Sequence, residues 1–487
     1  MAYDLGTTLV KAALVAFDGT IVGCESLHYK TYCLSPGCAE QEPEEWWECI
    51  CKITRSLVQA YPEHVKEIAA IGICGHMLGC LPVNAAGEPL RRAMIHADSR
   101  AVEQKKNIDR LIGASHLYSR TGGVLDQKTT LCKVLWIKDN EPEIYAETAR
   151  FLQAKDYLIY RLTGNLDSTD FSDASHAELL DIHTGRYLDA ELAELGIDVG
   201  KFPAVHKSTD VVGTLQAPAA RALNLRVGIP VAASGGDGAC ANVGAGICRP
   251  GDIYCSLGTT AWIACNADKP VMDPKQRVFN IVSLDGQSVG VFGTMQTAGK
   301  SVEWAKDVFG LPSARELDQG AARTPPGSAG MIFLPYLEGE RSPIFDNNAR
   351  GVFFGLNSRQ TSAHFMRAVL EGVAFALRSI LDVYREKANI TSMRIIGGGV
   401  KSRLWCQIIA DVCDIHLETI KGSSDSITSI GAAFAAGVAV GAYKNIVEAT
   451  AQIETDRTIL PDPQNRSLYD GMYAKFKDLY PNLKDIY

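Results

Sequence analysis

The sequence predicts an α/β protein of two lobes, and three observations support that prediction. Short apolar strands alternate along the chain with segments of helical periodicity, which is the pattern of an α/β fold. The length of 487 residues corresponds to about three domains or two large ones. A five-residue segment near the start of the chain also recurs at the start of its second half. The composition, 46% hydrophobic and 21% charged, is that of a globular chain with a sizeable core.

The first half of the chain opens with a predicted β-hairpin, because the tight-turn signal Asp18-Gly19 separates two β-rich runs. Predicted strands in this half are residues 10–17, 20–23 and 68–73. Predicted helices are residues 42–59, with Pro43 in the first turn, and segments between 101 and 162. Residues 75–100 are rich in Gly, Pro and Asn, which is typical of loops and short strands around a site.

The second half repeats this alternation of strands and helices. Predicted strands are residues 227–234, at the end of the first half, and then 254–257, 260–265, 331–334 and 394–396. A long helix is predicted over residues 361–387. A second helix is predicted from Trp405, because apolar residues recur there at i, i+3, i+4 and i+7. A dense loop is predicted over residues 335–355.

Two Gly-Thr turns form the internal repeat. The segment DLGTT at residues 4–8 returns as SLGTT at residues 256–260, 252 positions later, and each copy lies at a predicted turn between strands. Glycine lets a backbone approach an anion closely, and the flanking N–H groups and threonine hydroxyls are donors for phosphate. The candidate phosphate-binding residues are Gly6, Thr7, Thr8, Gly258, Thr259 and Thr260. The repeat predicts two related lobes that each direct a turn into one cleft; the alternative is two ordinary hairpin turns.

Two charged residues beside the first turn fit a nucleoside triphosphate as the ligand. Asp4 is a candidate to hold, directly or through water, the Mg²⁺ that accompanies the nucleotide. Lys11 is a candidate point charge for the phosphates. Other nucleotide-binding motifs do not fit. Residues 293–301 have five residues between their glycines where a P-loop has four, and no strand-GxGxxG-helix unit with a downstream acid occurs near the N-terminus.

Charge and cysteine spacing exclude several other classes of function. The formal net charge of −8 argues against a dedicated nucleic-acid or anionic-membrane surface. The 14 cysteines form no CxxC pair and match no zinc or iron–sulfur frame, so reduced core thiols in a cytoplasmic protein are expected. We expect no signal peptide, and the longest small-apolar stretch, near residues 430–443, is too short to span a bilayer.

Candidate catalytic and ligand-binding residues follow predicted strands. Asp237 comes after an apolar strand and two glycines and precedes Gly238, so no bulky neighbour blocks its carboxylate. Such a carboxylate suits a general base that takes a hydroxyl proton during attack on a γ-phosphate; the alternative is a turn or N-cap aspartate. His76 and Asp98 are candidates to hydrogen-bond a polyol, with a capping or core role as the alternative for each. Three glycines at residues 397–399 would let a flat adenine lie on the backbone; the alternative is a flexible connection.

Taken together, these segments resemble the FGGY family of carbohydrate kinases, within the actin–hexokinase–chaperone superfamily, over nearly the whole chain. The similar segments, in order, are DLGTT with Lys11 (first phosphate hairpin), residues 235–237 (catalytic aspartate), residues 256–260 (second phosphate hairpin), residues 335–341 running on to 351–356 (family signature), and residues 397–401 with Trp405, Gln407 and Asp411 (adenosine-binding segment). Each motif is short, but five in the family's order are specific. The resemblance marks Gly398, Gly399 and Lys401 as further ATP-binding candidates.

The resemblance implies two actin-like (ribonuclease H-like) lobes with a catalytic cleft between them. Residues 1–246 would bind the sugar and residues 247–487 the ATP, with the last ~40 residues as candidates to pack back on the first lobe. It also implies that ATP and Mg²⁺ phosphorylate a hydroxyl of a small sugar or polyol, with Asp237 as general base and lobe closure excluding water. The residues that it marks as sugar-binding are His76, Met77, Asp98, Asp237 and Gly238.

Within the family, the chain is most similar to xylulokinases, including residues 42–47 and 154–157. Three sugar-facing positions depart from their usual pattern. Gln-Met-His-Gly is replaced by His-Met-Leu-Gly at residues 76–79, Trp-Asn-Asp by His-Ala-Asp at residues 96–98, and the Asn after the catalytic aspartate by Gly238. Because hydrogen-bonding sites discriminate strongly through their polar contacts, these departures leave the identity of the sugar open.

The predicted function is therefore that of a cytoplasmic, Mg·ATP-dependent kinase of an uncharged sugar or polyol, a pentulose such as xylulose or ribulose. The alternatives are a kinase of gluconate, glycerol, erythritol or another alditol, a sugar-independent ATPase switch, and a sugar-sensing protein that has lost catalysis. A requirement for sugar in ATP turnover would distinguish a sugar kinase from a sugar-independent ATPase switch. The expected partners are the small-molecule substrate and a second copy of the chain in a homodimer, with no nucleic acid and no membrane.

Overall fold

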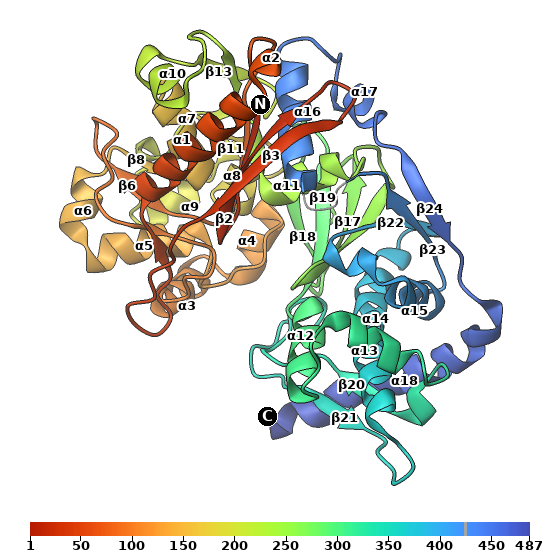
Figure 1. Cartoon of the computed structure of the whole chain (residues 1–487). Coiled ribbons are helices and arrows are strands. Elements are labelled where there is room, and N and C mark those ends of the chain that lie inside the picture. Colours follow the sequence, from red (N-terminus) through yellow and green to blue (C-terminus); the bar gives the residue numbers. More distant parts are fainter. Residues whose placement is uncertain (423–425) are drawn as a thin grey trace. The chain divides into compact units, whose positions relative to one another are not determined.

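Two compact units make up the computed structural model, which describes residues 1–422 and 426–487 (Figure 1). Unit 1 consists of Met1–Pro250, Asn266–Val291 and Ser426–Ile453, and unit 2 consists of Gly251–Cys265, Phe292–Asp425 and Glu454–Tyr487. The first long segment ends close to the boundary expected between residues 246 and 247. The part of the C-terminal region that joins unit 1 is Ser426–Ile453, whereas Glu454–Tyr487 belongs to unit 2. Helices and strands alternate in both units, which confirms the predicted α/β class.

The central sheet of unit 1 has five strands in the order β15-β5-β1-β2-β3. Their bounds are β1 Ala2–Leu5, β2 Leu9–Val15, β3 Ile21–His28, β5 Gly72–Gly75 and β15 Gly235–Gly236. β1, β2 and β3 are antiparallel neighbours, which confirms the predicted hairpin, and β5 and β15 run parallel to β1. Because parallel strands end at the same edge of a sheet, the residues that follow β1, β5 and β15 meet there. These residues are Gly6, His76 and Asp237.

Two predicted strands are shorter or begin later in the structure. The strand expected at residues 68–73 starts only at Gly72, and Ile71 forms an isolated bridge with Val231. Ile68 is buried in the core although it belongs to no strand. The strand expected at residues 227–234 is reduced to β14, Pro230–Ala232. Ile68 and Ile229 are buried outside any strand, whereas Val227 is 58% exposed, so the apolar runs predicted burial only in part and strand pairing less well.

Helices cover both faces of the unit 1 sheet. α1 (Pro43–Ala60) packs on β2 and β3, and α16 (Ile427–Ala439) packs on β1 and β5 (Figure 1). Successive strand residues face opposite sides. Ile73 lies in the core that contains Trp46 of α1, whereas a Cβ added at Gly72 would lie 2.2 Å from Ala432 O of α16. Position 72 therefore requires glycine, because only glycine lets α16 approach β5 so closely.

The remaining elements of unit 1 surround this sheet. The helices are α2 Pro62–Val65, α3 Val102–Leu111, α4 Ala114–Thr121, α5 Thr130–Asn140, α6 Pro142–Glu147, α7 Ala154–Thr163, α8 Phe171–His176, α9 Asp189–Glu194, α10 Ala217–Leu223, α11 Asp237–Gly244 and α17 Ile446–Thr450. The strands are β4 Glu40–Gln41, β6 Leu81–Val83, β7 Ala93–Met94, β8 Arg150–Leu152, β9 Thr169–Asp170, β10 Leu180–Asp181, β11 Arg186–Tyr187, β12 Val205–His206, β13 Val211–Thr214 and β18 Phe279–Val282.

Unit 2 is built on a mixed sheet in which the strands run in the order β19-β17-β16-β22-β23-β24. Their bounds are β16 Ile253–Leu257, β17 Ala261–Ala267, β19 Val289–Met295, β22 Ser392–Ile396, β23 His416–Ile420 and β24 Thr455–Ile459. The helices are α12 Gly299–Val308, α13 Ala314–Ala321, α14 Ser362–Arg385, α15 Arg403–Cys413 and α18 Arg466–Leu483, and β20 Ile332–Leu334 pairs with β21 Val352–Phe354. The helices predicted at residues 361–387 and from Trp405 correspond to α14 and α15.

The two copies of the Gly-Thr repeat have the same local topology. In unit 1 the turn joins the antiparallel strands β1 and β2, and β5 lies parallel to β1. In unit 2 the turn joins the antiparallel strands β16 and β17, and β22 lies parallel to β16. Each turn thus lies beside the end of a neighbouring parallel strand. Within residues 1–422 and 426–487, helices long and apolar enough to cross a membrane are not found.

Candidate active site

The first Gly-Thr turn connects β1 to β2, and protein donors hold all three of its carbonyl oxygens. The Tyr29 hydroxyl donates to Gly6 O, and the Tyr29 N–H donates to Thr8 O at 3.3 Å. Gln41 Nε2 donates to Thr7 O at 2.7 Å. In a trans peptide the C=O and the next N–H point in opposite directions, so the N–H groups of Thr7 and Thr8 point away from these donors. The turn is therefore suited to present N–H groups to an anion.

The second Gly-Thr turn connects β16 to β17 and is held in a similar way by the start of α12. The Gly299 N–H donates to Gly258 O at 2.8 Å, and the Lys300 N–H donates to Thr259 O at 3.0 Å. The N–H groups of Thr259 and Thr260 accordingly point away from α12. A Cβ at Gly299 would lie 2.6 Å from Gly258 O, so this contact requires glycine. The start of α12, whose glycine spacing does not fit a P-loop, thus donates to protein carbonyls.

Asp4 is fixed from two sides at the end of β1. Its side chain is 8% exposed, the Cys74 thiol donates to Oδ1 at 3.3 Å, and the Thr428 hydroxyl donates to Oδ2 at 2.5 Å. Lys11 lies opposite Asp4 in the register of β1 and β2. Thr428 is absent from the sequence-based candidates, because it lies 424 positions from Asp4 along the chain. A fixed carboxylate is a hard oxygen ligand of the kind that Mg²⁺ prefers.

The described residues form no ready-made metal cage. Within the described part of the chain, no group of three or more His, Cys, Asp and Glu side chains is placed to hold a metal ion. In nucleotide sites, Mg²⁺ is usually held by one or two carboxylates together with substrate phosphates and water, and not by a cage of protein ligands. Asp4 therefore fits a magnesium ion that arrives with a nucleotide.

Asp237 is the first residue of α11 and directly follows β15. Its side chain is half-buried, and its Oδ1 accepts the Gly238 N–H at 2.8 Å. Burial and the negative charge of Asp4 raise the pKa of Asp237 to about 7. The N-cap of α11 is Gly236, so the N-cap alternative for Asp237 is wrong. A carboxyl group that titrates near neutral pH is suited to accept a proton in a reaction.

His76 follows β5 and is 2% exposed, yet neither ring nitrogen has a hydrogen-bond partner among the described residues. Its ring lies edge-on to Trp46, with centroids 5.7 Å apart, and 6.4 Å from the ring of His96. Burial, and then the charges of His96 and Lys133, lower the pKa of His76 to about 3, so the imidazole is neutral. A buried polar group without a partner costs free energy, which hydroxyl groups of a ligand would offset.

The structure gives Met77 and Asp98 different surroundings. Met77 is packed against β15, where a Cβ at Gly236 would lie 2.5 Å from its Sδ. Asp98 is 0% exposed, and its Oδ2 accepts the Ala39 N–H at 2.8 Å and Arg100 Nη2 at 2.6 Å. This carboxylate is thus committed to a buried ion pair, which supports the core role that was the alternative for Asp98.

The glycines after β22 lie against the second Gly-Thr turn. Cβ atoms at Gly397 and Gly399 would lie 2.6 Å and 2.5 Å from atoms of Leu257, at the end of β16. A Cβ at Gly398 would meet no described atom within 4 Å. The segment Gly398–Lys401 forms a 3₁₀ turn, and Lys401 is exposed. The backbone at Gly398 is therefore open beside the turn, as contact with a flat ring requires.

Two family models match the chain. The FGGY family of carbohydrate kinases, N-terminal domain, matches residues 1–244, and the C-terminal domain of the same family matches residues 253–440. The chain belongs to this family. It is therefore a carbohydrate kinase, an enzyme that phosphorylates a sugar with ATP as the phosphoryl donor.

The FGGY kinase is similar over its full length to several named proteins. It is 32% identical to the xylulose kinase of Bacillus subtilis (strain 168), over 99% of this chain and 97% of the relative. It is 30% identical to the xylulose kinase of Escherichia coli (strain K12), over 99% of this chain and 98% of the relative. Among solved structures, the xylulose kinase from Rhodospirillum rubrum is similar, with a TM-score of 0.91, 28% identity and coverage of 99% and 98%. The fold is accordingly the two-lobed, actin-like fold of FGGY sugar kinases, as predicted.

A buried lysine of the kinase lies beside the end of β5. Lys155 of α7 is 0% exposed, and a Cβ at Gly75 would lie 3.1 Å from Lys155 Cβ. Lys155 Nζ lies 2.7 Å from Asp156 Oδ1, 3.0 Å from Asp170 Oδ1 and 3.2 Å from Asp173 Oδ2. Burial raises the pKa of Asp173 well above its ordinary value. In the sequence, Lys155 belongs to the segment similar to xylulokinases but shows no sign of burial, because lysine on a helix is usually exposed.

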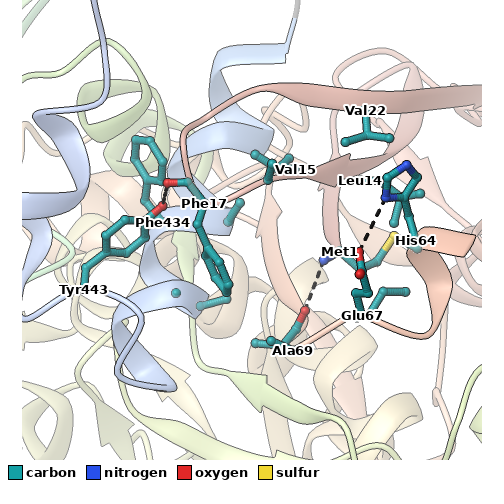
Figure 2. Close-up of a pocket in the computed structure, with 16 residues that line it drawn as sticks. Met1, Leu14, Val15, Phe17, Val22, His64, Glu67, Ala69, Phe434 and Tyr443 are labelled. Carbon is teal, nitrogen blue, oxygen red and sulfur yellow. Dashed lines mark hydrogen bonds and ion pairs between the residues drawn. The ribbon is translucent and has the colours of Figure 1, made fainter.

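A cavity in unit 1 of the kinase lies at the other end of β1 (Figure 2). It is lined by Met1, by the β2–β3 hairpin, by residues between 64 and 70, and by α16 with Tyr443. Figure 2 shows Met1, His64 and Glu67 on one side of the cavity and Phe434 and Tyr443 on the other. Its lining includes none of the candidate catalytic, phosphate-binding or sugar-binding residues. This cavity is therefore separate from the edge at which β1, β5 and β15 end.

Proposed function

We propose that the kinase transfers the γ-phosphoryl group of Mg·ATP to a hydroxyl of a pentulose, such as xylulose or ribulose, with Asp237 as the general base. The observation that carries this proposal is the carboxyl group of Asp237, whose pKa is raised to about 7, at the sheet edge where the unpartnered His76 also lies. Similarity to proteins named xylulose kinase supports a pentulose as the acceptor.

In the proposed reaction, Asp237 takes the proton of the acceptor hydroxyl while the hydroxyl oxygen bonds to the γ-phosphorus. The bond between this phosphorus and the β–γ bridging oxygen breaks, and ADP leaves. Asp4 would hold Mg²⁺, which neutralises charge on the phosphates when it is bound. The residues proposed to bind ATP are Gly6, Thr7, Thr8, Lys11, Gly258, Thr259, Thr260, Gly398, Gly399 and Lys401.

The proposed acceptor is an uncharged sugar. Asp237 places a carboxylate at this edge of the sheet, and it would repel the carboxylate of an aldonate such as gluconate. The neutral imidazole of His76 supplies one donor and one acceptor for sugar hydroxyls. Met77 would pack on the carbon chain of the sugar, and Gly238 would leave room for it. Because ATP is the donor, the proposed location is the cytoplasm.

Release of ADP over a panel of ketoses, alditols and aldonates tests the proposed function. We expect ATP turnover that depends on added sugar, fastest with D-xylulose or D-ribulose and slow with glycerol, erythritol and gluconate. Each rate is compared with the rate without acceptor. Equal ADP release with and without every sugar would contradict a sugar kinase and favour an ATPase switch. A preference for gluconate would contradict the repulsion argued from Asp237.

The pH dependence of the reaction follows from the raised pKa of Asp237. A general base works only in its ionised form, so kcat/KM for the sugar should be level above about 7 and fall as the pH drops through about 7. Below that pH, the expected slope is about tenfold per pH unit, since each unit lowers the ionised fraction tenfold. Steady-state rates between pH 5 and 9 measure this profile. A plateau that continues down to pH 5 would contradict it.

A further inference from the structure

The ion cluster around Lys155 has one cation and three carboxylates, and all four side chains are buried. Burying several charges is costly, and such a cluster is usually no more stabilising than apolar packing of the same volume. Its position suggests another role, since Asp170 and Asp173 lie at the start of α8, whose residues contact β15. β15 is the two-residue strand that leads directly into Asp237.

Asp170 orients the hydroxyl group of Ser172. Asp170 Oδ1 lies 3.0 Å from Lys155 Nζ, while its Oδ2 accepts the Ser172 N–H at 2.9 Å and the Ser172 hydroxyl at 2.6 Å. A serine hydroxyl has one proton to donate and two lone pairs that accept. Because that proton is directed to a carboxylate, the lone pairs of Ser172 Oγ are available to another donor. That donor is the Gly236 N–H, at 2.9 Å.

A second serine, Ser208, links Asp170 to Ser234, the residue that precedes β15. Ser208 Oγ donates to Asp170 Oδ2 at 2.7 Å, and Ser208 O accepts the Ser234 N–H at 2.8 Å. Ser234 has a φ of +51°, a left-handed conformation that is strained for a residue other than glycine. Strained residues of this kind persist where surrounding contacts fix them. Asp170 therefore reaches both Ser234 and Gly236 through one serine each.

We infer that Lys155, Asp170 and Ser172 are positioning residues for Asp237: the buried ion cluster orients the Ser172 hydroxyl, which holds the backbone at Gly236 and so places the carboxylate of the next residue. The inference rests on the proposed role of Asp237 as the base. A Cβ at Gly235 would lie 2.4 Å from Leu284 Cδ2 and 3.0 Å from Ser172 Oγ, so glycine at that position lets both Leu284 and α8 approach β15. None of the three positioning residues needs to touch the sugar or ATP.

Ser172→Ala removes a single oxygen atom, the one that accepts the Gly236 N–H. Ser175→Ala is its matched control. Ser175 is on the same helix, is equally buried, and hydrogen-bonds Ser172 O and the Val282 N–H but not β15. The measurements are kcat, KM for ATP and sugar, thermal stability, and amide hydrogen exchange of the segment that contains Gly236 in the free protein.

For Ser172→Ala we expect kcat to fall by about 10- to 100-fold, the loss typical of a misplaced catalytic group, with KM for ATP unchanged. We also expect faster exchange of the Gly236 amide, since its hydrogen bond is lost. Ser175→Ala should lower thermal stability while leaving kcat and Gly236 exchange near those of the unaltered kinase. Equal losses of kcat in the two variants, or faster exchange with an unchanged kcat, would overturn the inference.

The two readouts also separate this inference from the proposed function. If the unaltered kinase shows no sugar-dependent turnover, the proposed function fails, and hydrogen exchange still decides whether Ser172 holds Gly236. If sugar-dependent turnover is present and the Gly236 amide exchanges equally in Ser172→Ala and the unaltered kinase, the positioning role fails and the proposed function stands.

Discussion

Replacing Asp237 by asparagine is expected to lower kcat by roughly 10²- to 10⁴-fold, the range that general-base catalysis usually contributes. Asparagine keeps the size of the side chain and still accepts the Gly238 N–H, which in the kinase lies 2.8 Å from Asp237 Oδ1. It cannot take a proton from the acceptor hydroxyl. Binding of ATP should be retained, because the phosphate-binding turns are unchanged. Steady-state kinetics with the best sugar, together with calorimetric titration of ATP, measure the two properties.

The control for this variant is Asp18→Asn, the same chemical change at the tip of the β2–β3 hairpin. Asp18 is exposed, and its Oδ1 accepts the Thr20 N–H at 2.9 Å. We expect its kcat to match that of the unaltered kinase. If Asp237→Asn also keeps the original kcat, Asp237 is not the base. If Asp237→Asn instead loses ATP binding, Asp237 acts mainly in binding the nucleotide.

Replacing Lys155 by methionine is expected to cost roughly 3–5 kcal/mol of the free energy of unfolding, the usual effect of removing one partner from a buried ion pair. Asp156, Asp170 and Asp173 would remain buried without their common cation, which lies 2.7–3.2 Å from each of them. Denaturation by urea, followed by circular dichroism, measures the loss.

The loss of stability in Lys155→Met should depend on pH. Burial raises the pKa of Asp156 and of Asp173 and the positive charge of Lys155 lowers it, so removing the lysine raises the folded-state pKa of these two groups further. Groups of this kind stabilise the folded state at low pH and lose that contribution as the pH rises through the folded-state pKa. The free energy of unfolding of Lys155→Met should therefore fall more steeply than that of the unaltered kinase between about pH 5 and pH 8.

Lys133→Met is the matched control for this prediction. Lys133 is also 0% exposed, but its Nζ donates to two backbone carbonyls, Leu78 O at 2.6 Å and Ile95 O at 2.8 Å. Its removal leaves unpaired carbonyls and no new cluster of buried carboxyls, so the extra pH dependence should be absent. Equal pH dependence in the two variants would show that the carboxylates around Lys155 do not carry the effect.

The parts of this fold that the sequence predicts are those with local signals. The hairpin at Asp18-Gly19, the long helix α14 and the position of Asp237 after an apolar run depend on glycines, turn residues and periodicity within a few positions. The Gly-Thr turns were found because they repeat, and the structure places both between antiparallel strands. Their role in phosphate binding stays a prediction.

The rest depends on contacts between distant parts of the chain, which no local pattern encodes. Thr428 donates to Asp4 across 424 positions, and nothing near Thr428 in the sequence indicates that partner. Lys155 lies in a helix whose sequence gives no sign that the ammonium group is buried. Asp98 was a sugar-binding candidate from its place in a loop, whereas the Ala39 N–H, 59 positions away along the chain, donates to its buried carboxylate. In each case, tertiary packing and not local sequence decides the role.

The position of α16 in unit 1 has a consequence for synthesis of the protein. The face of β1 and β5 is covered by α16, which starts at Ile427, although β1 is made first. While the ribosome adds the residues in between, that face stays uncovered, and at about 5–20 residues per second this lasts tens of seconds. This face of β1 and β5 therefore stays open to chaperones or to other chains until nearly nine-tenths of the 487 residues have been made.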